Sequence, residues 1–359
     1  RLALTGCLGA AVLAARAFGE FAVLSPGGDF LPAPGPSVRA PVTAATAAAA
    51  RAENAFAFEL LRALRADKSA TDNMLASPLS VSAALALAYA GARGETAEQI
   101  AAALQFGSTT AADVHTGLGG WLADLSTPRE QYELSIANRA FGQEGFSFHD
   151  EYLRTLSEAY QAPLETLDFA TAPDAARQAI NQWIADHTRD RIQDLLPSGS
   201  VTKQTRLTLA NAVAFNGAWM HPFYESSTWS APFSTLSGVA QQVDMMHQVE
   251  TFRYGAFDGF QMLEMPYVGG DLSMVVMLPD ASDGLAALES TMTGVAFESS
   301  VAQLSPRQVE LSLPRFAFDD GASLQPALEA LGMTDAFTYA ADFSGIADID
   351  LQISNVIHK

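Results

Sequence analysis

The sequence predicts an α+β fold, with helices concentrated in its first half and strands in its second half. Apolar residues recur at helical spacing as far as about residue 188, and beyond residue 206 they alternate with the period of two that is typical of strands. The two kinds of element do not alternate regularly, and the chain has no internal repeat. These features argue against a parallel α/β sheet and against a repeat architecture.

The composition is that of a packed globular protein. The chain has 359 residues, of which 49% are hydrophobic and 17% charged, and its 20 basic and 40 acidic residues give a formal net charge of −20. This excess of acid argues against nucleic acid as a partner. No apolar run is long enough to predict a transmembrane segment. The single cysteine, Cys7, cannot form a disulfide within the chain.

The first 50 residues are expected to lie outside the folded domain. Residues 1–17 resemble a clipped signal peptide, because an apolar run ends in Ala15-Arg16-Ala17, and this interpretation predicts secretion. Leu4-Thr5-Gly6-Cys7 also resembles a bacterial lipobox, and an Ala-rich leader without a targeting role is a third interpretation. Residues 18–50 are rich in Pro, Gly and Ala, which predicts a disordered lead-in.

The helices are predicted from apolar spacing and from their first residues. Residues 51–66 carry a stripe of Phe56, Leu60 and Leu64. Ser77-Pro78 places a capping hydroxyl before a proline, which predicts a helix from Pro78 to about Tyr89. Thr96 and Gln99 have the spacing of a capping box, which predicts a helix as far as Leu104. Further helices are expected over residues 111–124, 149–160, 173–188 and 324–331.

The strands are predicted from period-two alternation. Residues 207–215 are apolar or small on both faces, which predicts a strand inside the molecule, where Asn211 must find hydrogen-bond partners. Gly269-Gly270 lies between two alternating runs and predicts a hairpin. The other strands expected are residues 132–140, 308–314 and 350–354.

The sequence shows no motif of an enzyme. It contains no HExxH, CxxC, P-loop, GxGxxG or G-x-S-x-G pattern, and its six histidines have no helical i, i+4 pairing. We therefore expect no catalytic residue, no metal and no cofactor.

Seven separated strings in one order resemble the serpin family of serine protease inhibitors. They are residues 73–80 with 90–96, 180–184, 209–219 with 222–223, 313–316, 331–333, 341–346 and 353–359. The residues that carry the resemblance are Asn73, Pro78, Gly91, Thr96, Asn181, Phe215, Gly217, Pro222, Phe223, Pro314, Phe343 and Gly345.

The resemblance implies a fold of three β-sheets with eight to nine helices, and a function that depends on conformational change. A serpin offers an exposed loop to a serine or, less often, a cysteine protease. The protease cleaves the loop and stays bound as a covalent acyl-enzyme while the loop inserts as a new strand of the large sheet. The native state is then a metastable one. A non-inhibitory serpin that acts as a carrier, chaperone or storage protein is the alternative.

The resemblance also assigns roles to individual residues. Ser77, Ser80, Asn211 and His358 are expected beneath the middle of the large sheet, in the family's shutter, where the central strands part. Trp219 is expected in the breach, where the loop first enters that sheet.

Three departures from the family pattern qualify these expectations. Asn216 stands where the family most often has Lys, and we expect no consequence for the mechanism. Residues 111–124 have no Lys or Arg, so heparin is not expected as a partner. The chain ends at Lys359, before the reactive loop and the last strands would begin. Residues 51–359 are therefore expected to be an incomplete serpin domain, without its reactive-site bond and inactive in this form.

Overall fold

The computed structural model describes residues 2–6, 22–23, 43–66, 68–69, 72–236 and 239–359. Cys7, the predicted cleavage pattern at residues 15–17 and most of the predicted lead-in lie outside the described residues. The leader and the secretion that it implies therefore stay predictions.

The described residues form nine α-helices, in agreement with the expected number. They are α1 (Ala44–Ala66), α2 (Pro78–Tyr89), α3 (Gly94–Ala103), α4 (Ala111–Leu125), α5 (Asp150–Tyr160), α6 (Pro173–Thr188), α7 (Leu285–Thr291), α8 (Gly294–Gln303) and α9 (Gln325–Ala330). The strands are β1 (Leu2–Gly6), β2 (Ala22–Val23), β3 (Tyr132–Gln143), β4 (Leu164–Leu167), β5 (Leu207–Gly217), β6 (Thr228–Ser234), β7 (Ala240–Phe257), β8 (Phe260–Pro266), β9 (Ser273–Pro279), β10 (Ser305–Pro314), β11 (Ala322–Ser323) and β12 (Ile353–His358).

The strands are joined by hydrogen bonds into two six-stranded sheets. The large sheet has the order β11-β12-β1-β5-β3-β4, and the second has β2-β10-β7-β8-β9 with β6 beside β7. The second sheet corresponds to two of the three expected sheets. Its long strand β7 pairs with β6 through residues 240–246 and with β8 through residues 253–257, so that one strand joins the two parts.

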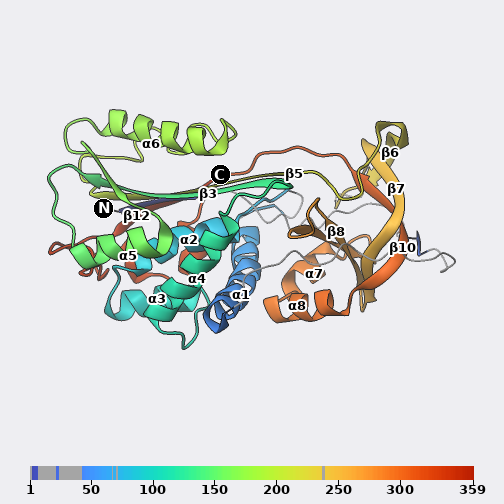
Figure 1. Ribbon diagram of the computed structural model, residues 1–359, viewed down its shortest axis with the longest axis horizontal. Helices are drawn as coiled ribbons and strands as arrows, with labels where there is room; N and C mark the ends of the chain where they lie inside the picture. Colours follow the sequence, from blue (N-terminus) through green and yellow to red (C-terminus); the bar gives the residue numbers. More distant parts are fainter. Residues whose placement is uncertain (1, 7–21, 24–42, 67, 70–71, 237–238) are drawn as a thin grey trace.

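Helices cover both faces of the large sheet, as Figure 1 shows with α6 on one side and α2 and α5 on the other. The alternation along β5 explains this arrangement. Leu207 and Leu209 belong to the core formed with the helices α1–α5, whereas Ala210 and Ala212 pack with α6. Because both faces are covered, β5 is buried from Leu207 to Val213, as the sequence predicts.

The middle of the large sheet contains a strand from the distant N-terminal part of the chain. β5 and β12 do not pair with each other, because β1 lies between them and runs parallel to both. β5 runs antiparallel to β3, so the sheet is mixed. We call the position between β5 and β12 the seam.

Three predictions from the sequence need correction. The first 50 residues do not all lie outside the folded domain, because β1 pairs within the large sheet and β2 within the second sheet. α1 begins at Ala44, inside the segment expected to be disordered. Its alanines favour a helix. The helix also packs closely on α4 at Gly117, where an added Cβ would lie 2.5 Å from the carbonyl oxygen of Ala45. The capping box at Thr96 and Gln99 is also wrong, because α3 begins at Gly94 and both side chains bind distant backbone instead.

Candidate functional site

The site is organised by the first turn of α2, as the sequence predicts. Ser77 is the N-cap, and its hydroxyl oxygen accepts a hydrogen bond from the backbone N–H of Ser80 at 3.3 Å. Pro78 occupies the first helical position, where no backbone donor is needed. Both serines are buried beneath the large sheet.

Ser77 and Ser80 contact strands on opposite sides of the seam. The backbone N–H of Ser77 donates to Nε2 of His358 on β12 at 2.9 Å. The hydroxyl of Ser80 donates to Oδ1 of Asn211 on β5. His358 is 4% exposed and Asn211 is 0% exposed, so water cannot replace these contacts. The first turn of α2 therefore holds β12 and β5 while β1 lies between them.

The hydrogen-bond network continues to residues that the sequence did not point out. Nδ2 of Asn211 donates to Oδ1 of Asn138 at 2.7 Å. Asn138 lies directly opposite Asn211 in the antiparallel pairing of β3 and β5. Its own Nδ2 donates to the backbone carbonyl of Tyr160 at 3.2 Å. The sequence shows Asn138 within the strand predicted over residues 132–140. It does not show the register that places Asn138 opposite Asn211.

The Tyr160 side chain links this network to α4. Its hydroxyl lies 2.6 Å from Nδ1 of His115. Burial lowers the pKa of His115 to about 4 and raises the pKa of Tyr160. His115 is therefore neutral near pH 7, and one hydrogen bond joins its ring to the Tyr160 hydroxyl.

Trp219 lies apart from the shutter, just beyond the end of β5. Its ring stacks on Tyr267 with centroids 4.3 Å apart and planes at 15°. Tyr267 in turn meets Phe215 of β5 edge-on at 4.8 Å. Trp219 also packs against the core of the second sheet, so it joins the end of β5 to that sheet.

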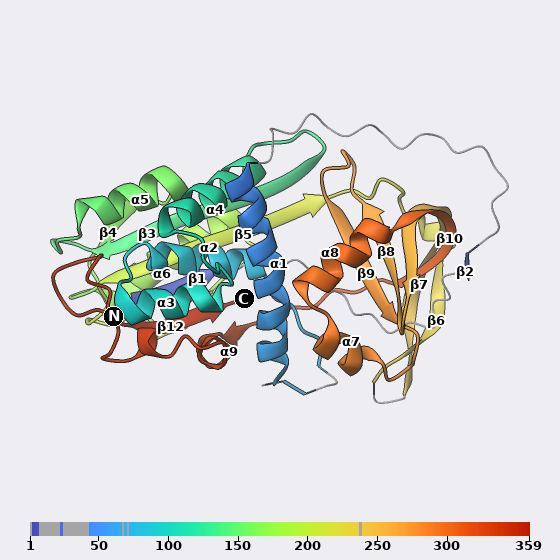
Figure 2. The same ribbon diagram turned by 90° about the horizontal axis from the view of Figure 1, so that it is seen from below.

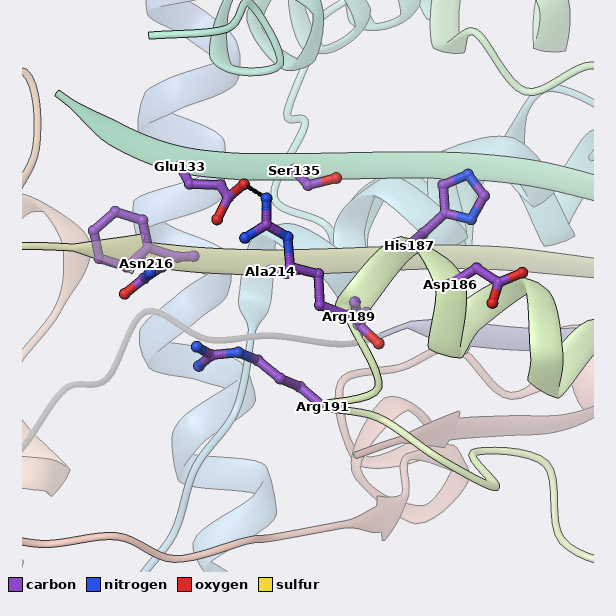
Figure 3. Close-up of a pocket in the computed structure, with 10 residues that line it drawn as sticks. Glu133, Ser135, Asp186, His187, Arg189, Arg191, Ala214 and Asn216 are labelled. Atoms are coloured by element: carbon purple, nitrogen blue, oxygen red, sulfur yellow. Dashed lines mark ion pairs between the residues drawn. The ribbon is translucent and has the colours of Figure 1, made fainter. Parts of the chain in front are cut away.

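A pocket of about 220 Å³ lies between the end of α6 and the strands β3 and β5. Figure 3 shows the Arg189 side chain extending from the end of α6 to Glu133 on β3, with which it forms an ion pair. Asp186, His187 and Arg191 also line the pocket. Because both signs of charge are present and Arg189 is already paired, the lining does not single out a class of ligand.

A comparison with known protein families identifies the family to which this chain belongs. The family description "Serpin (serine protease inhibitor)" matches residues 51–359. The chain belongs to the serpin family. It is 39% identical over 316 residues to Serpin B6 of Pongo abelii, with 86% of this chain and 84% of that protein covered. It is 37% identical over 317 residues to the leukocyte elastase inhibitor of Bos taurus, with 86% and 83% covered.

A solved structure agrees with the serpin assignment. Emu (Dromaius novaehollandiae) ovalbumin superimposes with a TM-score of 0.83 at 31% identity, covering 86% of this chain and 84% of that chain. The expected α+β serpin fold is therefore confirmed.

Most of the serpin motif residues lie away from the seam and have packing roles. Asn181 holds the segment after α6, because its amide exchanges two hydrogen bonds with the backbone of Leu196. Thr96 accepts a hydrogen bond from the backbone N–H of Asp342 at 2.9 Å. The others are the exposed Asn73, Gly91 against Ile346, Phe215 and Gly217 beside Tyr267, Pro222 with Phe223 near the second sheet, Pro314 at the end of β10, the buried Phe343, and Gly345 against Arg93.

Within the described part of the chain, no group of three or more His, Cys, Asp or Glu residues could hold a metal ion. None of the helices in these described residues is both long enough and apolar enough to span a membrane.

Proposed function

We propose that this serpin, when it carries a reactive loop, inhibits serine or cysteine endopeptidases by inserting the cleaved loop as a strand at the seam. The protease acts as the catalyst, and the serpin supplies the loop and the sheet that receives it. The covalent acyl-enzyme forms on the protease, so this chain needs no nucleophile of its own.

The observation that carries the proposal is the occupied seam. A segment about two hundred residues away from β5 in the sequence forms backbone pairs with both β5 and β12 at this position. The large sheet can therefore accept, between β5 and β12, one strand that is distant in the sequence from both neighbours. A strand added there gains hydrogen bonds on both edges, each contributing about 1 kcal/mol net.

The shutter contacts support the same proposal. Ser77 binds the strand on one side of the seam and Ser80 the strand on the other. A change in the spacing of β5 and β12 must therefore remake at least one of these buried contacts. Such a cluster gives the sheet two discrete arrangements rather than a continuous range.

The alternative is a serpin with the same fold that does not inhibit, and acts as a carrier, chaperone or storage protein. The two functions share the sheet and differ in the loop. Small loop residues such as Ala and Thr permit insertion, whereas charged or bulky residues and Pro hinder it.

The test uses the natural gene product, with any residues that follow Lys359, and a panel of trypsin-like, chymotrypsin-like and subtilisin-like proteases. We expect a complex with one of them that resists SDS, and a rise in thermal stability after loop cleavage. Cleavage without such a complex and without thermal stabilisation would favour the alternative. A protease whose catalytic serine is replaced by alanine is the control, because it binds the loop but cannot form the acyl-enzyme.

A further inference from the structure

A carboxylate lies in the apolar face of α1, where the helix packs on α2. Glu53 precedes Phe56, Leu60 and Leu64 on the buried face and is itself 8% exposed. The only hydrogen bond of its carboxyl group within the described residues joins Oε2 to the Ser82 hydroxyl of α2 at 2.5 Å, and Oε1 is buried without a partner. A buried acid with one neutral partner and no cation is costly to ionise.

The geometry around Ser82 gives a second reason to place a proton on Glu53. The Ser82 oxygen lies 2.5 Å from Oε2 of Glu53 and 3.2 Å from the backbone carbonyl of Leu79. A hydroxyl has one hydrogen and can donate to only one of these oxygens. Both contacts are satisfied together when Glu53 is protonated and donates to Ser82, while Ser82 donates to Leu79.

Ionisation changes this arrangement. The Ser82 hydroxyl must then turn toward the carboxylate, which removes its bond to Leu79 and leaves Oε1 charged and without a donor. Burial raises the pKa of Glu53 to about 7, while the Ser82 hydrogen bond lowers it by a smaller amount. The two arrangements therefore exchange within the neutral pH range.

We propose that Glu53 and Ser82 form a proton-operated contact that fixes α1 to α2 when Glu53 is protonated and loosens the two helices when it is ionised. Ser82 lies one helical turn from the first residues of α2, which bind β12 and β5 through Ser77 and Ser80. Loosening α2 therefore weakens the support beneath the seam. That consequence for strand insertion rests on the proposed function, whereas the effect on folding stability does not.

None of the surrounding ionisable groups pairs with Glu53 in the described part of the chain. On α2, the one ionisable residue is Tyr89. The groups on α1 itself and on the other helices packed against it are Arg51, Glu59, Arg62 and Arg65 on α1, Asp113, His115 and Asp124 on α4, Glu289 on α7, Glu298 on α8 and Glu329 on α9. His115 stays neutral in the folded protein above pH 6, but the unfolded chain binds its proton near pH 6, so it adds a pH effect of opposite sign. This contribution is the same in the wild type and in both variants below, and it cancels when their pH dependences are compared.

The sign of the pH effect follows from the raised pKa. The contact stabilises the fold fully below the unfolded pKa of 4.5, and this stability is lost as the pH rises through about 7. For these two pKa values, the ratio of folded to unfolded protein falls about tenfold between pH 6 and pH 8 because of this group alone.

The test is urea unfolding of the whole chain at pH 6 and pH 8, for the wild type, Glu53→Gln and Glu59→Gln. Gln keeps the size of the side chain and cannot ionise, so Glu53→Gln should lose the tenfold pH effect. Glu59, on the same helix, pairs with Arg62 at the surface, and its variant should keep the wild-type effect. The inference is overturned if Glu53→Gln and the wild type show the same dependence on pH.

A direct titration keeps the inference testable if Glu53→Gln does not fold. The infrared carbonyl band of a protonated carboxyl group should be present in the folded wild type at pH 6 and absent at pH 8.5. In Ser82→Ala, which removes the hydrogen bond that lowers the pKa, the band should persist to higher pH. Absence of the band at pH 6, or the same titration in Ser82→Ala, would overturn the proposal. Failure to inhibit proteases would count against the proposed function and would not change these results.

Discussion

Replacing Asn211 by alanine removes the residue that joins α2 to two strands of the large sheet. Asn211 is fully buried, accepts from the Ser80 hydroxyl and donates to Asn138. The substitution leaves the Ser80 hydroxyl buried without a partner, which costs about 1–3 kcal/mol. Asn138 is only half-buried and adds a smaller loss. We expect a total loss of about 2–4 kcal/mol, which is a large share of the 5–15 kcal/mol typical of a folded protein.

The assay is urea unfolding followed by circular dichroism, with Asn216→Ala as the control. Asn216 lies on the same strand but is exposed, so its replacement should change stability by less than about 0.5 kcal/mol. Equal stabilities of the two variants would refute the reasoning, because the buried network would then contribute nothing. If the proposed function holds, Asn211→Ala should also convert faster to inserted or polymeric forms on heating.

Three further outcomes follow from the structure. Ser77→Ala should cost about 1 kcal/mol in urea unfolding, because it removes the cap of α2 but keeps the backbone bond to His358; a loss as large as that of Asn211→Ala would contradict this. Gly119→Ala should destabilise by about 1–3 kcal/mol, since its Cβ would lie 2.2 Å from a backbone oxygen of Ala159. The adjacent Gly120→Ala, in open space on the same helix, should stabilise by about 0.5–1 kcal/mol, and similar thermal midpoints for the two would refute the packing. The wild type should lose stability as the pH falls from 6.5 toward 4, because burial lowers the His115 pKa and the unfolded chain therefore binds the proton first. His115→Phe should reduce this loss, and unchanged acid sensitivity in the variant would contradict the account.

The parts of the site that the sequence predicted are those fixed by local chemistry. Ser77-Pro78 is a strong signal for the start of a helix, and α2 begins there. The apolar character of both faces of residues 207–215 required a covered strand, and the required partners of Asn211 are found in Ser80 and Asn138. The approach of His358 to Ser77 came from the serpin resemblance, because no local pattern connects residues so far apart.

The parts that the sequence did not predict depend on register and on long-range packing. Asn138 becomes part of the network only because β3 and β5 pair with it opposite Asn211. Thr96 and Gln99 match a capping box, but distant backbone groups offer their side chains better partners. Glu53 lies in the helix predicted over residues 51–66, but only the packing of α2 against that helix shows that Glu53 is buried.

Photo-crosslinking of an extended peptide provides the decisive measurement. The peptide has about twelve Ala and Thr residues with one photoreactive group in its middle, and its contacts are mapped by mass spectrometry on the whole chain. The proposed insertion requires crosslinks to both β5 and β12, with the peptide taking the place of β1, and a rise in thermal stability. Crosslinks confined to strands at the ends of the sheets, such as β4 or β9, or no crosslinks at all, would contradict it.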